Sequence, residues 1–415
     1  MSLQNARRPG RRAPAALAAI LALAGLLAAG APPAPAAAAP ARKSVSLLRD
    51  PVFVAASERG LGHLYAMRYA DADRQFAAIA ARYPGHPVGP FLRALPDWWR
   101  ILADPHDPRH DARFEASIEQ VIRNADRRLD RDRNDLDGKF FKGAALAFRG
   151  RFRSLRGDWL AAAVDCKRAL ALVRDVERLD PGNADLDFGL GLYDYFADVL
   201  PARYPILKPA TLFMPDADRR RGLRSLERVA TEGRFVDTES AYFLLQIHMF
   251  FEKDAEESLR WAHWLRRRHP GNAVFHELEG RLYARWGRRD RARRVLADVL
   301  DRWQAGAPGY TQAQAERALY VSAVLDMRDG EHRAALGKLA QLDRLPEPAG
   351  QERPLQTLGR LRQGMALDAL GQRDAAVSRY RQVLARGDVD DSHERARDHL
   401  SRPFRSGEIE SEPAS

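Results

Sequence analysis

The chain has 415 residues, of which 45% are hydrophobic and 30% charged, and its formal net charge is +11. The positive charge is almost entirely arginine in a chain that is rich in alanine throughout, so the basic balance alone does not indicate a nucleic-acid partner, and we expect none. The single cysteine, Cys166, excludes an intrachain disulfide. It lies in the apolar pattern of residues 161–170, which predicts a buried structural thiol rather than a reactive one.

The first forty residues have the three-part composition of an export signal. Residues 15–29 are apolar, residues 34–41 are small and contain several A-x-A sites, and four arginines come before both: Arg7, Arg8, Arg11 and Arg12. This pattern predicts a cleaved signal peptide over residues 1–40, followed by a flexible linker over 41–50. The apolar run is shorter than the roughly 20 residues that span a bilayer, which argues against a stable membrane anchor. We therefore expect an exported protein, periplasmic or extracellular.

Four residues after the linker follow the spacing of a known repeat. Gly60, Ala72, Phe76 and Pro84 are separated by 12, 4 and 8 positions. Small residues at the first two positions let paired helices approach closely, Phe76 fills the gap to the next pair, and Pro84 ends the second helix. This pattern resembles the tetratricopeptide-repeat (TPR) family, and in particular its exported bacterial members. The resemblance implies an all-α fold, a right-handed superhelical solenoid of antiparallel helix pairs.

Residues 51–200 continue as less regular repeats of the same kind. Apolar residues at spacings of three and four predict helices over 91–102 and 114–129, and a helix pair over 140–148 and 159–179. The pair ends at a short phrase that occurs three times, as Asp180-Pro-Gly-Asn183, as His269-Pro-Gly-Asn272 and, less fully, as Tyr83-Pro-Gly-His86. Three copies of one helix-ending phrase favour a single repeated unit.

Four prolines interrupt the helical pattern between residues 201 and 218, where the apolar composition predicts an ordered loop. Residues 219–400 are the most regular part of the chain. Ser258 and Ala292, two small residues on the first turns of apolar helices, lie 34 positions apart, which is the length of one unit. Two further units follow, separated by Gly- and Pro-rich insertions. The polar segment 401–415 predicts a disordered tail.

Motifs that carry catalysis are missing from the sequence. It lacks a Gly-rich phosphate loop, paired-cysteine spacing, H-E-x-x-H and G-x-S-x-G. The nearest approach to a metal site is the pair His106 and His110 with aspartates beside them, but Pro105 and Pro108 break the helical face that would bring the imidazoles together. We interpret this segment as a solvated loop and expect no enzyme, metal or cofactor. An enzyme site hidden in the irregular residues 88–218 is the alternative.

The candidate binding residues follow from the resemblance, in which the first helix of each pair lines the concave surface. Carried onto this sequence, the groove positions are Glu277, Arg281, Arg285, Tyr320, Arg328, Phe243 and Phe250. Arginine binds carboxylates and phosphates through a planar fork, so the three arginines would select an acidic partner; the alternative is a solvated face of mixed charge.

The function expected from this pattern is a non-enzymatic protein–protein interaction scaffold of the bacterial cell envelope, which binds a protein or peptide in a TPR groove. The alternative is a carrier or binder of anionic glycan or lipid in the periplasm. The two differ in their response to salt, because binding to a polyanion weakens steeply as ionic strength rises.

Overall fold

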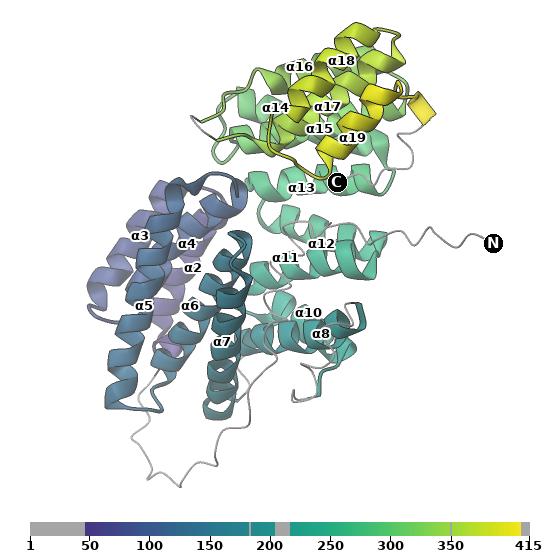
Figure 1. The fold of residues 1–415 in the computed structure, drawn as a ribbon. Coiled ribbons are helices and arrows are strands. Elements are labelled where there is room, and N and C mark those ends of the chain that lie inside the picture. Colours follow the sequence, from purple (N-terminus) through teal and green to yellow (C-terminus); the bar gives the residue numbers. More distant parts are fainter. Residues whose placement is uncertain (1–45, 182–183, 204–215, 349–350, 408–415) are drawn as a thin grey trace, which may run out of the picture. The chain divides into compact units, whose positions relative to one another are not determined.

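A computed structural model describes residues 46–181, 184–203, 216–348 and 351–407 (Figure 1). Helices and turns account for the regular structure of these residues and they contain no strand, which confirms the expected all-α class. None of the helices in these ranges is long and apolar enough to cross a bilayer. The expected signal peptide, and residues 204–215 of the expected proline-rich loop, lie outside the described residues.

Two compact units divide the chain, and neither is continuous in sequence. The first contains the described residues up to 56 together with 76–95 and 111–237, and the second contains 57–75, 96–110 and the residues from 238 onward. Three helices near the start of the described chain are divided between the two units: α2 (Pro51–Tyr65), α3 (Tyr69–Arg82) and α4 (Val88–Ala103). A division at one point between residues 200 and 219 would therefore not separate these two units.

The first unit is built on three long helices that pack in sequence, followed by a close helix crossing. Its remaining elements are η1 (Leu47–Arg49), α5 (Asp111–Arg131), α6 (Leu136–Leu155), α7 (Trp159–Leu179), η3 (Ala184–Leu186), α8 (Asp187–Arg203) and α10 (Arg219–Glu232). Helices α5, α6 and α7 form successive neighbours, and α8 packs on α10. At that crossing a Cβ on Gly222 would lie 2.6 Å from the backbone nitrogen of Tyr195, so only glycine allows the approach.

The described part of the expected linker is ordered. Leu47 and Leu48 are buried, and the Ser46 hydroxyl donates to Oδ1 of Asp137 at 2.5 Å. The backbone nitrogen of Leu47 donates to the other oxygen of the same carboxylate at 3.0 Å. These bonds and the burial of two leucines anchor residues 46–48 on the first unit, because a buried carboxylate needs such donors.

The second unit is a succession of helices in which each packs on the next from α12 to α19, and in which α15 also packs on both α13 and α17. Its elements are η2 (Pro108–His110), α11 (Asp237–Ile247), the π-helical turn η5 (His248–Glu252), α12 (Ala255–Arg268), α13 (Ala273–Arg285), α14 (Arg289–Gln304), α15 (Gln312–Arg328), α16 (His332–Asp343), α17 (Pro354–Ala369), α18 (Arg373–Leu384) and α19 (Ser392–Ser401).

The 34-residue interval joins two points of close helix packing. Ser258 and Ala292 are both fully buried. The Ser258 hydroxyl accepts a hydrogen bond of 3.0 Å from the indole nitrogen of Trp286, which stands in the turn before α14. On α13 a Cβ at Gly280 would lie 2.7 Å from Leu296 of α14. Small residues thus stand where neighbouring helices approach, as the sequence pattern predicts.

One turn geometry recurs in the second unit. After α13, α15 and α17 the chain reverses through Gly287, Gly330 and Gly371, whose φ angles are +73°, +81° and +74°. The next residue donates its N–H to a carbonyl five positions earlier, as Arg288 does to Tyr283 at 2.8 Å. Glycine adopts this left-handed conformation without the steric cost of a side chain, which is why it ends these helices.

Met67 occupies the same turn after α2, although it is not glycine. Its φ is +57°, and Arg68 donates to the His63 carbonyl at 2.9 Å as in the other turns. The methionine side chain is buried, and its sulfur lies 3.2 Å from the backbone nitrogen of Ala273. It also fills the space over Gly309, where a Cβ would come within 2.4 Å of the sulfur. A strained residue is kept here because its side chain packs on α13.

The chain after α19 is partly packed, which differs from the disorder expected from residue 401 onward. Phe404 is 3% exposed, and its backbone nitrogen donates to Oδ2 of Asp368 at 2.9 Å. Nε2 of His332 lies 3.0 Å from the Ser406 hydroxyl. The polar composition of the tail conceals this contact, because a single aromatic residue carries most of the burial. Residues 408–415 lie outside the described part of the chain.

Candidate binding surface

The first turns of α13, α15 and α17 are covered by this chain's own residues. The side-chain amide of Asn272 donates to the Tyr65 carbonyl at 3.0 Å, and Gln314 and Arg317 both donate to the Ala103 carbonyl, at 3.2 and 2.9 Å. Asn272 also caps α13, since its oxygen accepts from the backbone nitrogens of the first turn at 3.0 and 3.1 Å. The ends of α2 and α4 are therefore bonded to the starts of helices that come more than 200 residues later.

Aromatic rings fill the space around these bonds. The Trp99 ring packs edge-on against both Tyr65 and Phe275, with 5.5 Å between ring centroids in each case. The Tyr65 ring lies 4.7 Å from His269. Farther along, Arg353 pairs with Asp104 at 3.0 Å and with the buried Glu316 at 2.5 Å. These contacts join the ends of α2 and α4 to the starts of α13, α15 and α17 within the second unit.

Glu277, one of the expected groove residues, is buried. It is 1% exposed and forms ion pairs with Arg281 at 2.6 Å and with Arg317 at 2.9 Å. A carboxylate in this position fixes two guanidinium groups and is not accessible to a partner. Its contribution to binding would be indirect, through the orientation of Arg281.

Arg281 and Arg285 stand one turn apart on α13, beyond the covered region. The Arg281 side chain is 33% exposed, and Arg285 is half-buried. The Arg285 guanidinium lies over Phe250 at 5.7 Å and over Trp286 at 5.5 Å from the ring centroids. Burial lowers the pKa of Arg285, and the neighbouring charge of Arg281 lowers it further. The structure thus brings together Arg281, Arg285 and Phe250 of the expected set.

The other expected residues are distributed differently. Tyr320 and Phe243 are 4% and 8% exposed and belong to the core, whereas Arg328 is half-buried at the last position of α15, as Arg285 is at the last position of α13. The Tyr320 hydroxyl lies 3.4 Å from Nε of Arg362, a buried arginine that the sequence reasoning missed. The sequence could have pointed to Arg362, because this residue lies on α17, the first helix of the next pair.

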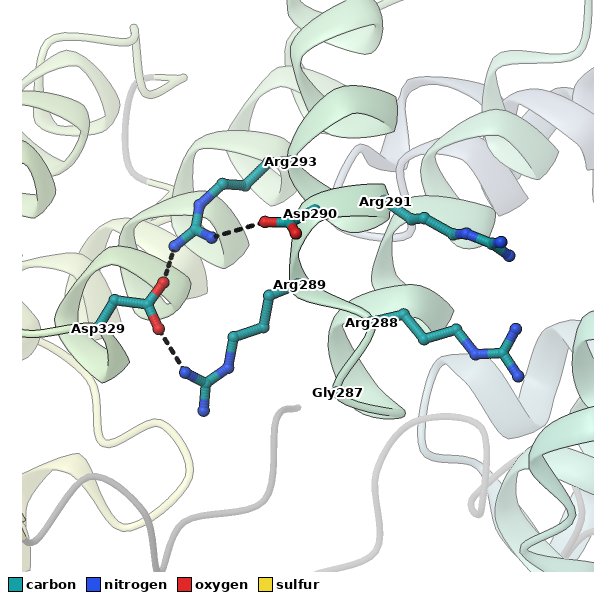
Figure 2. Close-up of a pocket in the computed structure, with 7 residues that line it drawn as sticks. All are labelled: Gly287, Arg288, Arg289, Asp290, Arg291, Arg293 and Asp329. Carbon is teal, nitrogen blue, oxygen red and sulfur yellow. Dashed lines mark hydrogen bonds and ion pairs between the residues drawn. The ribbon is translucent and has the colours of Figure 1, made fainter.

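A cation-lined cavity of about 480 Å³ lies at the turn between α13 and α14 (Figure 2). Its lining consists of Gly287, Arg288, Arg289, Asp290, Arg291, Arg293 and Asp329. Arg289 and Arg293 converge on Asp329, one on each carboxylate oxygen. That hydrogen bonding lowers the pKa of Asp329 and raises the pKa of Arg293.

The remaining two arginines of the cavity point the opposite way in Figure 2. Arg288 pairs with Glu256, and the Arg291 guanidinium lies 5.8 Å from the Tyr283 ring centroid. The sequence shows a dense run of arginines here, and pairing with acids accounts for part of it, as expected for a solvated face of mixed charge. Asp329 could not be placed in this cluster from the sequence, because it comes from the following helix pair.

The histidine-containing segment and the cysteine that the sequence singles out have structural explanations. Across the described residues there is no group of three His, Cys, Asp or Glu side chains placed to hold a metal ion. Nδ1 of His110 lies 3.5 Å from Asp97, and Asp107 pairs with Arg109 at 2.6 Å. Burial raises the pKa of the Cys166 thiol to about 12, so the thiol stays protonated at neutral pH.

No protein-family model and no curated protein matches this chain. The function is therefore argued from the geometry above.

Proposed function

We propose that this chain is a non-enzymatic scaffold of the bacterial cell envelope that binds an acidic protein or peptide through TPR-like repeats. In this proposal the helix pairs stack as a right-handed solenoid. Support comes from the left-handed turn that recurs after α13, α15 and α17, and from the packing of α15 on both α13 and α17. Export rests on the composition of residues 1–40, and the mass of the mature protein tests it: a new N-terminus within residues 34–41 is expected.

The binding surface in this proposal is the uncovered end of the first helices. Arg281, Arg285 and Arg328 supply the positive charge and Phe250 supplies an apolar contact. The observation that carries the proposal is the side-by-side placement of Arg281 and Arg285, two like charges held half-buried by Glu277 and by aromatic rings. Orienting both guanidinium groups in advance lowers the entropy lost when a carboxylate binds.

A charge-matched peptide experiment tests this function. The full chain is immobilised and presented with fluorescent peptides that alternate Glu with Leu, and with otherwise identical peptides that carry Lys. Substitution of Arg281, Arg285 and Arg328 by Gln is expected to weaken retention of the Glu peptide at least tenfold, since a charge-assisted bond contributes roughly 1.5–3 kcal/mol.

The matched control replaces three exposed arginines outside this surface: Arg294, Arg333 and Arg344. It should leave retention within about twofold. If both triple variants lose binding equally, the chain recognises net charge alone. Stronger retention of an anionic polysaccharide than of the Glu peptide, lost steeply with salt, would favour a glycan carrier instead.

A further inference from the structure

We propose that the cavity between α13 and α14 is a binding site for a phosphate group. Four arginines and two aspartates line it, so its lining has an excess of positive charge. The cavity has a volume of about 480 Å³, and in Figure 2 Arg289 and Arg293 point toward Asp329 whereas Arg288 and Arg291 point away from it.

Asp329 shows how the site would hold an anion. Its carboxylate accepts from Nη1 of Arg289 on one oxygen and from Nη2 of Arg293 on the other. A guanidinium group has five N–H donors, so one carboxylate uses only a small part of the donors that converge here. Arg293 also reaches Asp290 and Asp326, but at 3.8 and 3.7 Å, which are long contacts.

Phosphate fits these donors better than a second carboxylate does. A phosphate monoester offers three oxygen acceptors and nearly two negative charges at neutral pH, whereas a carboxylate offers two oxygens and one charge. Two convergent guanidinium groups match that charge. The side chains of Arg289, Arg293 and Asp329 are 41%, 32% and 27% exposed, so an incoming anion reaches the arginines without unfolding any helix.

Asp329 acts in this site as an internal competitor. It stands at the C-terminal cap of α15, next to Gly330, and its position is fixed by the turn and not by burial. An anion that binds Arg289 and Arg293 must displace this carboxylate or share the arginines with it. Removal of its charge should therefore strengthen phosphate binding. If the ion pairs of Asp329 served only to hold the arginines in place, the same change would weaken phosphate binding.

The test is a calorimetric titration of the full chain with inorganic phosphate at low ionic strength and pH 7.5. We expect saturable binding at one site with a dissociation constant on the order of 1 mM. Asp329→Asn should bind at least threefold more tightly, and Arg289→Gln with Arg293→Gln at least tenfold more weakly. A phosphoserine peptide in a second titration distinguishes a phosphorylated partner from free phosphate, since tighter binding of the peptide indicates the former.

The control is Arg333→Gln, an exposed arginine on α16 outside the cavity, which should bind phosphate as the unmodified chain does. Absence of saturable binding to both the unmodified chain and Asp329→Asn overturns the proposal. So does an equal loss in Arg333→Gln, because that result indicates attraction by net charge only. Circular dichroism of Asp329→Asn checks that its fold is unchanged, and phosphate affinity is scored separately from the peptide retention of the Arg281, Arg285 and Arg328 variant.

Discussion

The two ends of α13 differ in how far their side chains are exposed to solvent. At the start, Asn272, Phe275 and His276 are at most 3% exposed and pack within the second unit. At the other end, Arg281 and Arg285 keep part of their surface in solvent and hold positive charge side by side. A single repeat helix can thus assemble its unit at one end and present charge at the other, and the two ends should respond differently to mutation.

The largest effect is expected at the covered end, from Asn272→Ala. This change removes the cap of α13 and the buried amide that donates to the Tyr65 carbonyl. The loss should be about 3 kcal/mol of unfolding free energy, measured by urea denaturation. Asn272→Ser keeps a capping oxygen and loses the amide donor without adding a charge, so a milder loss separates the two roles. Asn134→Ala, at an exposed position, is the control and should cost less than about 0.5 kcal/mol.

Acidification should weaken the same end. Burial, the main cause, lowers the pKa of both His269 and His276 to about 4, and neighbouring arginine charge adds to it. Their pKa in the unfolded chain is about 6.5, so the unfolded state binds more protons between these values and stability falls as pH drops through that window. From pH 7 to pH 5 we expect a loss of about 2 kcal/mol per histidine.

Urea denaturation at pH 7, 6 and 5 measures this loss. His276→Gln should remove about half of the pH dependence that the two histidines produce together. An unchanged slope in that variant would mean that the proton-linked loss has another source. In the folded chain the Thr238 hydroxyl lies 2.8 Å from Nε2 of His269, and the Tyr310 hydroxyl lies 2.8 Å from Nδ1 of His276.

Met67→Gly should produce an intermediate effect. The substitution relieves about 1 kcal/mol of left-handed backbone strain but removes a buried side chain, which costs about 2–3 kcal/mol. The net loss should be about 1–2 kcal/mol in thermal or urea unfolding. Gly287→Ala tests the strain alone, since its Cβ would meet no atom within 4 Å, and should cost about 1 kcal/mol. A gain in stability from Met67→Gly would show that the methionine contacts α13 only weakly.

The smallest effect is expected at the open end. Arg285→Gln should change the unfolding free energy by less than about 1 kcal/mol, because the guanidinium is partly exposed and its charge is disfavoured by burial. Peptide retention by this variant should nevertheless fall. A loss of stability comparable to that of Asn272→Ala would contradict the proposal that α13 has a structural end and a recognition end.

Local patterns in the sequence predicted most of the helices. The spacing of Phe114, Ile118 and Val121 corresponds to the buried stripe of α5, and Ser258 and Ala292 lie where neighbouring helices touch. The shared phrase before Asn272 was interpreted as a helix end. It also begins the next helix, since Asn272 is the cap of α13, and no pattern showed that its amide would bind Tyr65.

The remaining features depend on contacts between distant segments, which periodicity does not encode. The end of α4 docks on α15 through Gln314 and Arg317, and Tyr320 and Phe243, which were expected in a groove, are core residues. Met67 stands in a left-handed turn where glycine is usual, and the contact of its sulfur with the backbone of Ala273, 206 positions later, accounts for it. Asp329 belongs to a different helix pair from Arg289 and Arg293, so its ion pairs with them depend on how neighbouring pairs pack.

The discontinuity of the second unit also constrains the order of folding. Tyr65 and Asn272 are 207 positions apart, and Ala103 and Gln314 are 211 apart. At about 5–20 residues per second, the ribosome makes Tyr65 and Trp99 some 10–40 s before their partners exist. Closing loops of this length is slow, and Trp99 at the end of α4 cannot pack on Phe275 until α13 has been made. The contacts of Tyr65 and Ala103 in the second unit can therefore form only after Asn272 and Gln314 have been made.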